Sequence, residues 1–283
     1  MSNPRGSAAV DASDDAVVEL FGRRLRVIDL SHRLSNATSA FELNPHRIEY
    51  FEHGAGAQTS EAIGIDPSLW PDGRAWAVEL VHLSTHAGTH VDAPWHYAPT
   101  SGGAPARTID QVPLRWCIGN GVLLDMTDKR AGEGITDADC REALDRLGYA
   151  LRPYDIVLVR TDASLHFRQP GYELRHAGLR RSATAFLVEQ GVKLIGIDAW
   201  GLDRPFDVMA DEARAGDTAQ LWESHFYGSE REYCQIEKLE NLAALPAALG
   251  FTVVALPVLL EGAGAAWSRV VALFDEPEGS GGA

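Results

Sequence analysis

The chain has 283 residues, of which 45% are hydrophobic and 23% charged, a composition typical of a folded globular protein. Its formal net charge of −15 argues against nucleic acid and anionic membrane surfaces as partners, because both attract clusters of Lys and Arg. The three cysteines are widely spaced and odd in number, which argues against a disulfide framework and favours a reducing, cytoplasmic location.

Both ends of the chain are rich in small and polar residues. Residues 1–15 and 276–283 could bury little apolar surface, so we expect each to form a disordered tail. Between them the sequence contains no clear linker and no repeat. We therefore expect a single domain over residues 16–275.

Apolar runs and alternating patterns between these ends predict strands. They lie at residues 26–30, 76–84, 121–126, 155–160, 193–197, 251–256 and 269–274. Thr136 and Ser182 can cap helices that continue to residues 147 and 190, and apolar spacing predicts a third helix over residues 237–249. Because strands alternate with helices, we expect an α/β fold with a mixed, partly parallel sheet.

The most informative segment is residues 86–96, which contains three of the ten histidines and one aspartate. Gly88 and Pro94 disfavour a continuous helix here. In an extended backbone, His90 and Asp92 point to the same face, since strand side chains repeat every two residues. Imidazole and carboxylate ligands together suit Zn, Mn or Fe. We expect a metal site in this segment, with a polar loop as the alternative interpretation.

Two residues of this segment have further possible roles. Asp92 carries two oxygens and could bridge two metal ions. His96 lies beyond Pro94 and need not be a ligand. Since imidazole titrates near neutral pH, His96 suits a general acid or base beside a metal-activated water.

The same segment carries a family resemblance. It matches, at every fixed position, the His-x-Gly-Thr-His-x-Asp-x-Pro-x-His signature of the cyclase family of metal-dependent hydrolases, which includes bacterial kynurenine formamidases and isatin hydrolases. The matching residues are His86, Gly88, Thr89, His90, Asp92, Pro94 and His96. The chain is also similar to the family at Asp29-Leu30-Ser31, at residues 195–198, and around His225 and Glu237.

The resemblance implies a swivelling β/β/α fold in a homodimer or homotetramer. It also implies one or two divalent ions, Zn or Mn, with His96 as the acid/base. The metal ligands that it implies are His86, His90, Asp92, His225 and Glu237. Without the resemblance, His225 would be interpreted as a surface residue and Glu237 as part of a solvated helix face.

The chain departs from the bacterial kynurenine formamidases upstream of the signature. Residues 32–41 contain no Trp, whereas those enzymes resemble one another in a Trp-Pro segment there, and a longer insert occupies residues 44–76. We therefore expect an aromatic pocket that differs from that of the kynurenine formamidases or is larger. We expect its substrate to be an aromatic small molecule other than a kynurenine derivative. Candidates to line the pocket are Phe41, Trp95 and Trp200, although burial in the core is the default for aromatic side chains.

Three functions are compatible with these features. The first is a metal-dependent hydrolase that cleaves an amide or cyclic amide, such as an aryl formamide or an isatin-like lactam, by metal-activated water with His96 as acid/base. The second is a metal-dependent cyclase or dehydratase of a biosynthetic pathway. The third is a non-catalytic protein that binds a metal or ligand. A fold-level resemblance alone does not choose among them.

Overall fold

The computed structural model describes residues 16–276, so the tails expected at both ends lie outside the described residues, apart from residue 276. Four parallel strands form the centre of a ten-stranded sheet. In spatial order they are β8 (Ile118–Asp125), β10 (Ile156–Arg160), β12 (Leu194–Ile197) and β13 (Cys234–Glu237). These strands are apolar along most of their length because both faces of a central parallel sheet are covered.

Antiparallel strands extend this centre in both directions. Next to β8 follow β14 (Phe251–Val254), β16 (Val271–Asp275), β2 (Arg23–Asp29) and β1 (Ala16–Leu20). Next to β13 follow β5 (His90–Asp92) and β15 (Ala265–Trp267). The mixed α/β sheet that the sequence predicts is therefore confirmed.

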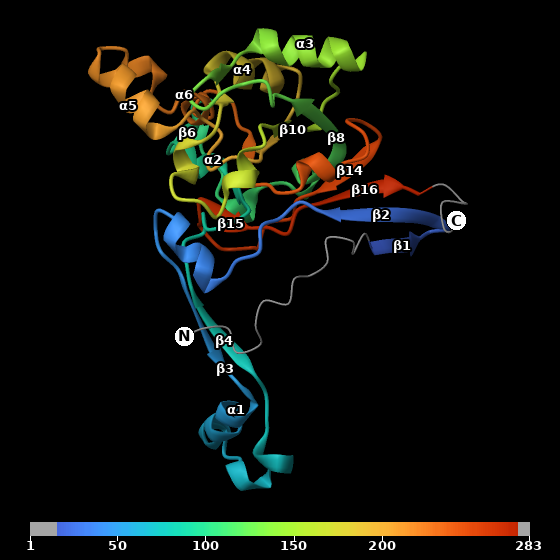
Figure 1. Cartoon of the computed structure of the whole chain (residues 1–283), viewed down its shortest axis with the longest axis vertical. Coiled ribbons are helices and arrows are strands. Elements are labelled where there is room, and N and C mark those ends of the chain that lie inside the picture. The colour runs from blue at the N-terminus through green and yellow to red at the C-terminus, as the bar shows by residue number, and fades with distance from the viewer. Residues whose placement is uncertain (1–15, 277–283) are drawn as a thin grey trace.

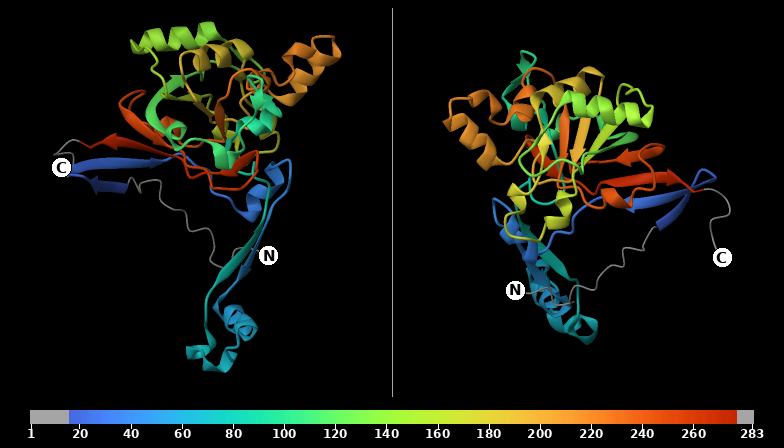
Figure 2. Two further views of the ribbon diagram at one scale, coloured as in Figure 1. Left: turned by 180° about the vertical axis from the view of Figure 1, so that it is seen from behind. Right: turned by 45° about the horizontal axis from the view of Figure 1, so that its top comes forward.

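Helices α3 (Asp137–Leu147) and α4 (Arg181–Glu189) lie together over one face of the sheet (Figures 1 and 2). As predicted, Thr136 caps α3 and Gly148 closes it in a left-handed conformation. The predicted cap at Ser182 is wrong, because α4 already begins at Arg181, whose amide donates to the Glu223 carboxylate at 2.9 Å. Such a long-range cap is invisible to local sequence patterns.

The remaining elements are short. They are helices α2 (Pro94–Tyr97), α5 (Phe206–Arg214) and α6 (Glu223–Tyr227), the strand pair β6 (Thr100–Ser101) and β7 (Ala104–Pro105), and the strand pair β9 (Gly134–Ile135) and β11 (Gly178–Leu179). None of the helices in the described part of the chain combines the length and apolar character needed to cross a bilayer.

The helix expected at residues 237–249 does not form. Glu237 instead ends strand β13, and the following residues contain only a short 3-10 turn, Leu242–Ala244. Lys238 and Asn241 both adopt positive φ, and Pro246 cannot continue a helix. Leu239, Leu242 and Leu245, whose spacing resembles that of a helix, are buried against the second face of the sheet. Their spacing therefore reflects contacts with the sheet and not a helix.

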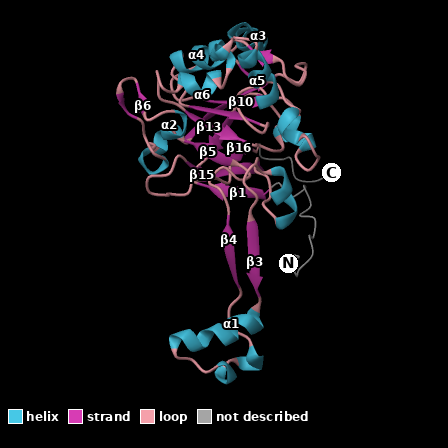
Figure 3. Ribbon diagram, turned by 90° about the vertical axis from the view of Figure 1, so that its left-hand side faces the viewer, coloured by secondary structure: helices cyan, strands magenta, loops and turns pink. Residues whose placement is uncertain are grey.

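Residues 47–82 form an arm that projects away from the sheet (Figures 1 and 3). Its two strands, β3 (Arg47–Phe51) and β4 (Val78–His82), pair antiparallel, and helix α1 (His53–Thr59) lies at its tip. Every residue of β4 is exposed. The strand predicted over residues 76–84 is therefore present, but it belongs to the arm and not to the main sheet.

Candidate active site

Strands β5 and β13 bring three acidic and imidazole side chains together inside the sheet. His90 and Asp92 alternate along β5 and both have 0% exposed surface, while Glu237 pairs directly with His90 across the two strands. The His90 Nε2 atom lies 3.3 Å from Asp92 Oδ1 and 3.5 Å from Glu237 Oε2. The alternation of a strand thus positions two of these groups, and sheet register positions the third.

Three further histidines converge on the same carboxylate. His86 Nδ1 lies 2.9 Å from Asp92 Oδ1, and both His96 Nε2 and His225 Nε2 lie 3.9 Å from Asp92 Oδ2. Gly88 makes the turn that returns His86 toward β5, with a φ of +61° that favours glycine. All six polar residues singled out in the sequence therefore gather around Asp92, although they come from separate parts of the chain.

The hydrogen bonding of these groups leaves ligand atoms free. His90 Nδ1 donates to the Gly88 carbonyl at 2.8 Å, so the lone pair of Nε2 is available, and this buried atom has no hydrogen-bond partner. Neither oxygen of Asp92 accepts a hydrogen bond of acceptable geometry. Since buried charged groups require a partner, and imidazole and carboxylate ligands suit divalent transition metals, these residues fit a metal ion.

Two sets of three ligand atoms lie within 4.8 Å of one another, and Asp92 belongs to both. One set contains His86, Asp92 and His96, and the other contains His90, Asp92 and Glu237. Sharing of the Asp92 carboxylate is the arrangement that a bridging ligand between two ions would require. The donor set is equally compatible with one ion.

Asp203 orients the imidazole of His225 through hydrogen bonds. The Asp203 carboxylate accepts a hydrogen bond from His225 Nδ1, and it also accepts the backbone amides of Ser224 at 2.7 Å and His225 at 3.2 Å. This fixes the tautomer of His225 so that the lone pair of Nε2 points toward Asp92 and Glu237. Carboxylate–histidine pairs of this kind orient metal ligands. No local sequence pattern distinguishes Asp203, which lies 22 residues from its partner.

Burial and neighbouring charges set the protonation of the cluster. Burial favours the neutral form of Asp92, but His90, His86 and His96 outweigh it and hold the pKa of Asp92 well below its usual range. For Glu237, burial and the nearby Asp92 charge raise the pKa. For His96, burial is the main cause that lowers the pKa to about 4, so its imidazole is neutral at pH 7 but is a weaker base than the free imidazole expected from the sequence.

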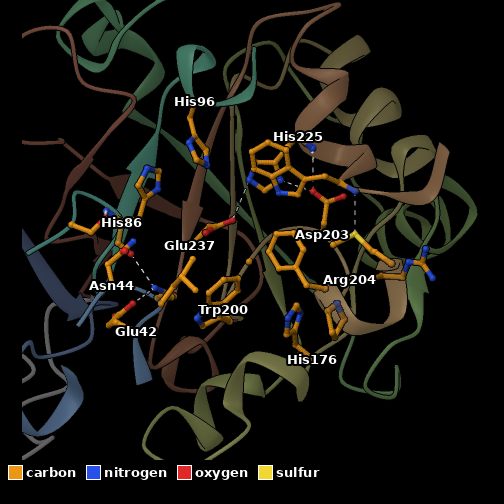
Figure 4. A pocket seen from close by; sticks show the side chains of 18 residues that line it. Glu42, Asn44, His86, His96, His176, Trp200, Asp203, Arg204, His225 and Glu237 are labelled. Atoms are coloured by element: carbon orange, nitrogen blue, oxygen red, sulfur yellow. Dashed lines mark hydrogen bonds and ion pairs between the residues drawn. The ribbon is translucent and has the colours of Figure 1, made fainter. Parts of the chain in front are cut away.

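A cavity of about 290 Å³ opens beside this cluster (Figure 4). His86, His96, His225 and Glu237 line its polar side. Aromatic and apolar side chains also line the cavity, and they are Trp200, Phe206, Met209, Trp222 and Leu43. The cavity can therefore hold a flat apolar molecule against the polar cluster.

The candidate pocket residues from the sequence lie in different places. Trp200 lines the cavity. Phe41 is half-buried at the end of a 3-10 turn, Asn36–Phe41, and Trp95 is 46% exposed; neither lines the cavity. Trp222, which sequence reasoning missed, does line it and stacks on His225. Among seven tryptophans, only tertiary structure separates Trp222 from the rest.

Comparison with known proteins identifies the family. The Cyclase family model matches residues 28–204, which include the whole segment 86–96. The chain belongs to the cyclase family. A kynurenine formamidase from Bordetella petrii is 30% identical to this cyclase-family chain over 195 residues, covering 69% of the chain and 79% of that protein. A kynurenine formamidase from Bacillus mycoides is 25% identical over 163 residues, covering 52% and 69% respectively.

Solved structures of other proteins share the fold of this cyclase-family chain. Isatin hydrolase A from Labrenzia aggregata, bound to benzyl benzoate, superposes with a TM-score of 0.69 at 22% identity, covering 89% of the chain and 94% of that structure. Isatin hydrolase A from Ralstonia solanacearum has the same TM-score and identity and covers 89% and 92%. A potential metal-dependent hydrolase with cyclase activity superposes with a TM-score of 0.59 at 22% identity, covering 89% and 100%.

Proposed function

We propose that this chain is a metal-dependent hydrolase that cleaves the C–N bond of an amide or cyclic amide on an aromatic compound. The observation that carries the proposal is the position of His96, which lies beside the Asp92-centred cluster and lines a cavity with an aromatic wall. The kynurenine formamidases among its relatives and the isatin hydrolases among its structural neighbours support this reaction class.

The residues proposed to hold the metal are His86, His90, Asp92, His225 and Glu237. The unpartnered atoms of His90 and Asp92 support this assignment, as does the Asp203 carboxylate behind His225. We propose one or two ions of Zn or Mn, with Asp92 as the bridging group if two bind. A bound divalent ion supplies Lewis acidity toward a carbonyl oxygen and lowers the pKa of water.

His96 is the proposed acid/base. Its Nε2 atom faces Asp92 across 3.9 Å, and its ring edge meets Trp222, with 5.3 Å between centroids. As the neutral imidazole, His96 accepts the proton of the attacking water, and as the imidazolium it donates that proton to the departing nitrogen. The C–O bond forms and the C–N bond breaks, so the products are a carboxylic acid and an amine.

The aromatic wall defines the proposed substrate class. Trp200 (Figure 4), Phe206 and Trp222 all line the cavity, and Trp222 also stacks on His225. An aryl formamide or an isatin-like lactam places a flat ring on such a wall and its carbonyl at the cluster. Most of the insert at residues 44–76 lies in the arm, but its first residue, Asn44, lines the cavity and supports a substrate different from that of the kynurenine formamidases.

Ring closure with loss of water is the second candidate, supported by the structural relative that is described as having cyclase activity. The two reactions differ in the fate of water. Turnover in ¹⁸O-labelled water should place the label in the product acid of a hydrolase. A product without label would support the cyclase or dehydratase.

We further propose that the chain acts as a homodimer or homotetramer in the cytoplasm. The exposed apolar side chains of the arm support assembly, and three free, buried cysteines support a reducing compartment. No nucleic acid or membrane partner is proposed, since the net charge is −15.

The proposed function is tested first by metal content. Protein purified without a chelator or a metal-affinity column is analysed by plasma mass spectrometry, and aryl formamides, isatin-like lactams and lactones are then screened as substrates. One or two equivalents of Zn or Mn with turnover of a C–N substrate are expected. Protein that contains no metal and takes up none on dialysis would leave a non-catalytic binding protein as the better explanation.

A further inference from the structure

A buried ion pair lies against the candidate metal site. Lys238 Nζ and Glu42 Oε2 are 2.5 Å apart, and each side chain is only 4% exposed. Both residues line the cavity (Figure 4), although 196 residues separate them in the chain. Buried ion pairs add little net stability, because desolvation of the two charges offsets their attraction. The pair therefore calls for an explanation other than stability.

The Glu42–Lys238 pair forms hydrogen bonds with the backbone of residues 86–96, the signature segment, at two points. Glu42 Oε1 accepts the Gly88 amide at 2.7 Å, and Lys238 Nζ donates to the His86 carbonyl at 2.9 Å. These two backbone groups flank Ala87, so they fix the turn that aims His86 toward Asp92. Both partners of the ion pair thus act on the same three residues.

The second ligand region is attached to the same turn. Lys238 directly follows Glu237, and its carbonyl accepts the Thr89 hydroxyl at 2.5 Å. Lys238 therefore contacts the signature segment through its side chain at His86 and through its backbone at Thr89. These contacts add to the β5–β13 pairing, which already joins His90 to Glu237.

Lys238 also adopts a backbone conformation that a lysine rarely occupies. Its φ is +57°, in the left-handed region where glycine is accommodated without strain. Among the described residues that line the cavity, Trp222 is the other non-glycine residue with positive φ. Strained residues that persist next to a site are associated with its function. A glycine would relieve the strain at this position, but it would lack the ammonium group that contacts Glu42 and the His86 carbonyl.

We propose that Glu42 and Lys238 are positioning residues, which set the metal-binding geometry of His86 and Glu237 through the turn at Ala87 and the backbone at Lys238. This inference rests on the proposed metal site. It assigns neither residue a contact with the reacting atoms. Outer groups that orient metal ligands commonly contribute a 10- to 100-fold effect on metal affinity, and about tenfold is expected here.

The test measures Co²⁺ binding by the purified full chain with Lys238→Met, Lys238→Gly and Glu42→Gln, singly, and with the double variant Glu42→Gln/Lys238→Met. Affinity is determined by competition with a chelator, and the visible absorption of bound Co²⁺ reports ligand geometry. Lys238→Gly removes the ammonium and also relieves the strained backbone. Lys129→Met is the matched control, because it breaks the Lys129–Asp139 ion pair, which does not line the cavity.

Weaker binding by about tenfold and an altered Co²⁺ spectrum are expected for each single variant at Glu42 or Lys238, in protein that is still folded but less stable, because the remaining buried charge has lost its partner. The double variant should lose less than the product of the single losses, because the two residues act as one unit. Lys129→Met should bind like the unaltered chain.

Two results would overturn the inference while leaving the proposed function intact. One is unchanged affinity and spectrum in folded Glu42 and Lys238 variants. The other is loss of the fold in both Lys238→Met and Lys238→Gly, which would make the pair a requirement of folding. If the unaltered chain itself binds no Co²⁺, the proposed function fails and the inference fails with it.

Discussion

The indole ring of Trp222 stacks on the imidazole of His225, with 4.1 Å between ring centroids and 15° between their planes. The same indole meets the ring of His96 edge-on, at 5.3 Å and 87°. Trp222 also has a φ of +55°, which is costly for a bulky side chain, by about 1 kcal/mol or more. One aromatic residue thus contacts a proposed ligand, the proposed acid/base and the cavity.

Replacement of Trp222 by Leu should lower kcat/KM about fivefold, because ring stacking contributes about 1 kcal/mol beyond the apolar area that it buries. Leucine keeps a Cβ at the strained position, so the backbone is not relieved and the change reports on the ring. Steady-state kinetics with the best substrate of the screen measures the effect. Trp95→Leu serves as the comparison: it should stay within twofold, and a larger loss there would restore Trp95 as a pocket residue.

Replacement of His96 by Ala should reduce kcat by about 10³-fold, within the usual contribution of a general acid/base, and leave the metal content unchanged. The reason is that five other residues remain to hold the metal. Rate measurements and plasma mass spectrometry on the same preparation separate the two effects. Full activity in this variant would refute the assigned role, and loss of metal together with activity would make His96 a ligand.

Asp203→Asn should weaken metal binding by about tenfold or more. An asparagine of the same shape removes the negative charge that favours the His225 tautomer with its Nε2 lone pair toward the cluster. Competition with a chelator measures the affinity. Asp207→Asn, on the exposed start of α5, is the control and should bind metal normally. Equal affinities in the two variants would show that Asp203 does not orient His225 for a metal.

Much of this site was predictable because it is encoded locally. The signature segment contains its own turn glycine and its own strand alternation, so His90 and Asp92 could be placed on one face from the sequence alone. The capping of α3 is equally local, with Thr136 before it and Gly148 after it. Short-range rules suffice where the partners are a few residues apart.

The rest depends on long-range contacts. The apolar spacing over residues 237–249 predicts a helix, but Leu239, Leu242 and Leu245 are buried in the core without forming one. Trp222, Asp203 and the Glu42–Lys238 pair meet the cluster only when distant segments come together. Their residue types are common, and nothing in their neighbours distinguishes them from surface or core positions.

Stability should depend on pH through Asp198, whose carboxylate is buried and whose pKa is raised to about 6, mainly by burial, despite hydrogen bonds from Thr161 and from the Asp162 amide. In the unfolded chain its pKa returns to 3.8. Between these values the folded state binds more proton than the unfolded state, so the contribution of Asp198 to stability is lost as pH rises from 4 to 6.

Urea unfolding of the unaltered chain and of Asp198→Asn, at pH 4 and pH 7, isolates this group, because all other titrations cancel in the difference. The variant should gain about 2 kcal/mol in unfolding free energy relative to the unaltered chain between pH 4 and pH 7. Its lost hydrogen bond shifts both values equally. A difference that does not change with pH would show that Asp198 titrates normally in the folded state.

The arm should be an assembly surface. Leu80 and Val81 are adjacent on β4 and point to opposite faces, yet they are 58% and 53% exposed, so neither face of the arm packs against the body at this position. A two-stranded hairpin alone is marginally stable in water, and a second copy of the chain would cover it.

Light scattering after gel filtration should therefore give a dimer or tetramer, and Leu80→Asp/Val81→Asp should shift it toward the monomer. Leu114→Asp, at an exposed apolar residue outside the arm, should not. A monomeric unaltered chain, or an arm variant that assembles as before, would contradict the prediction.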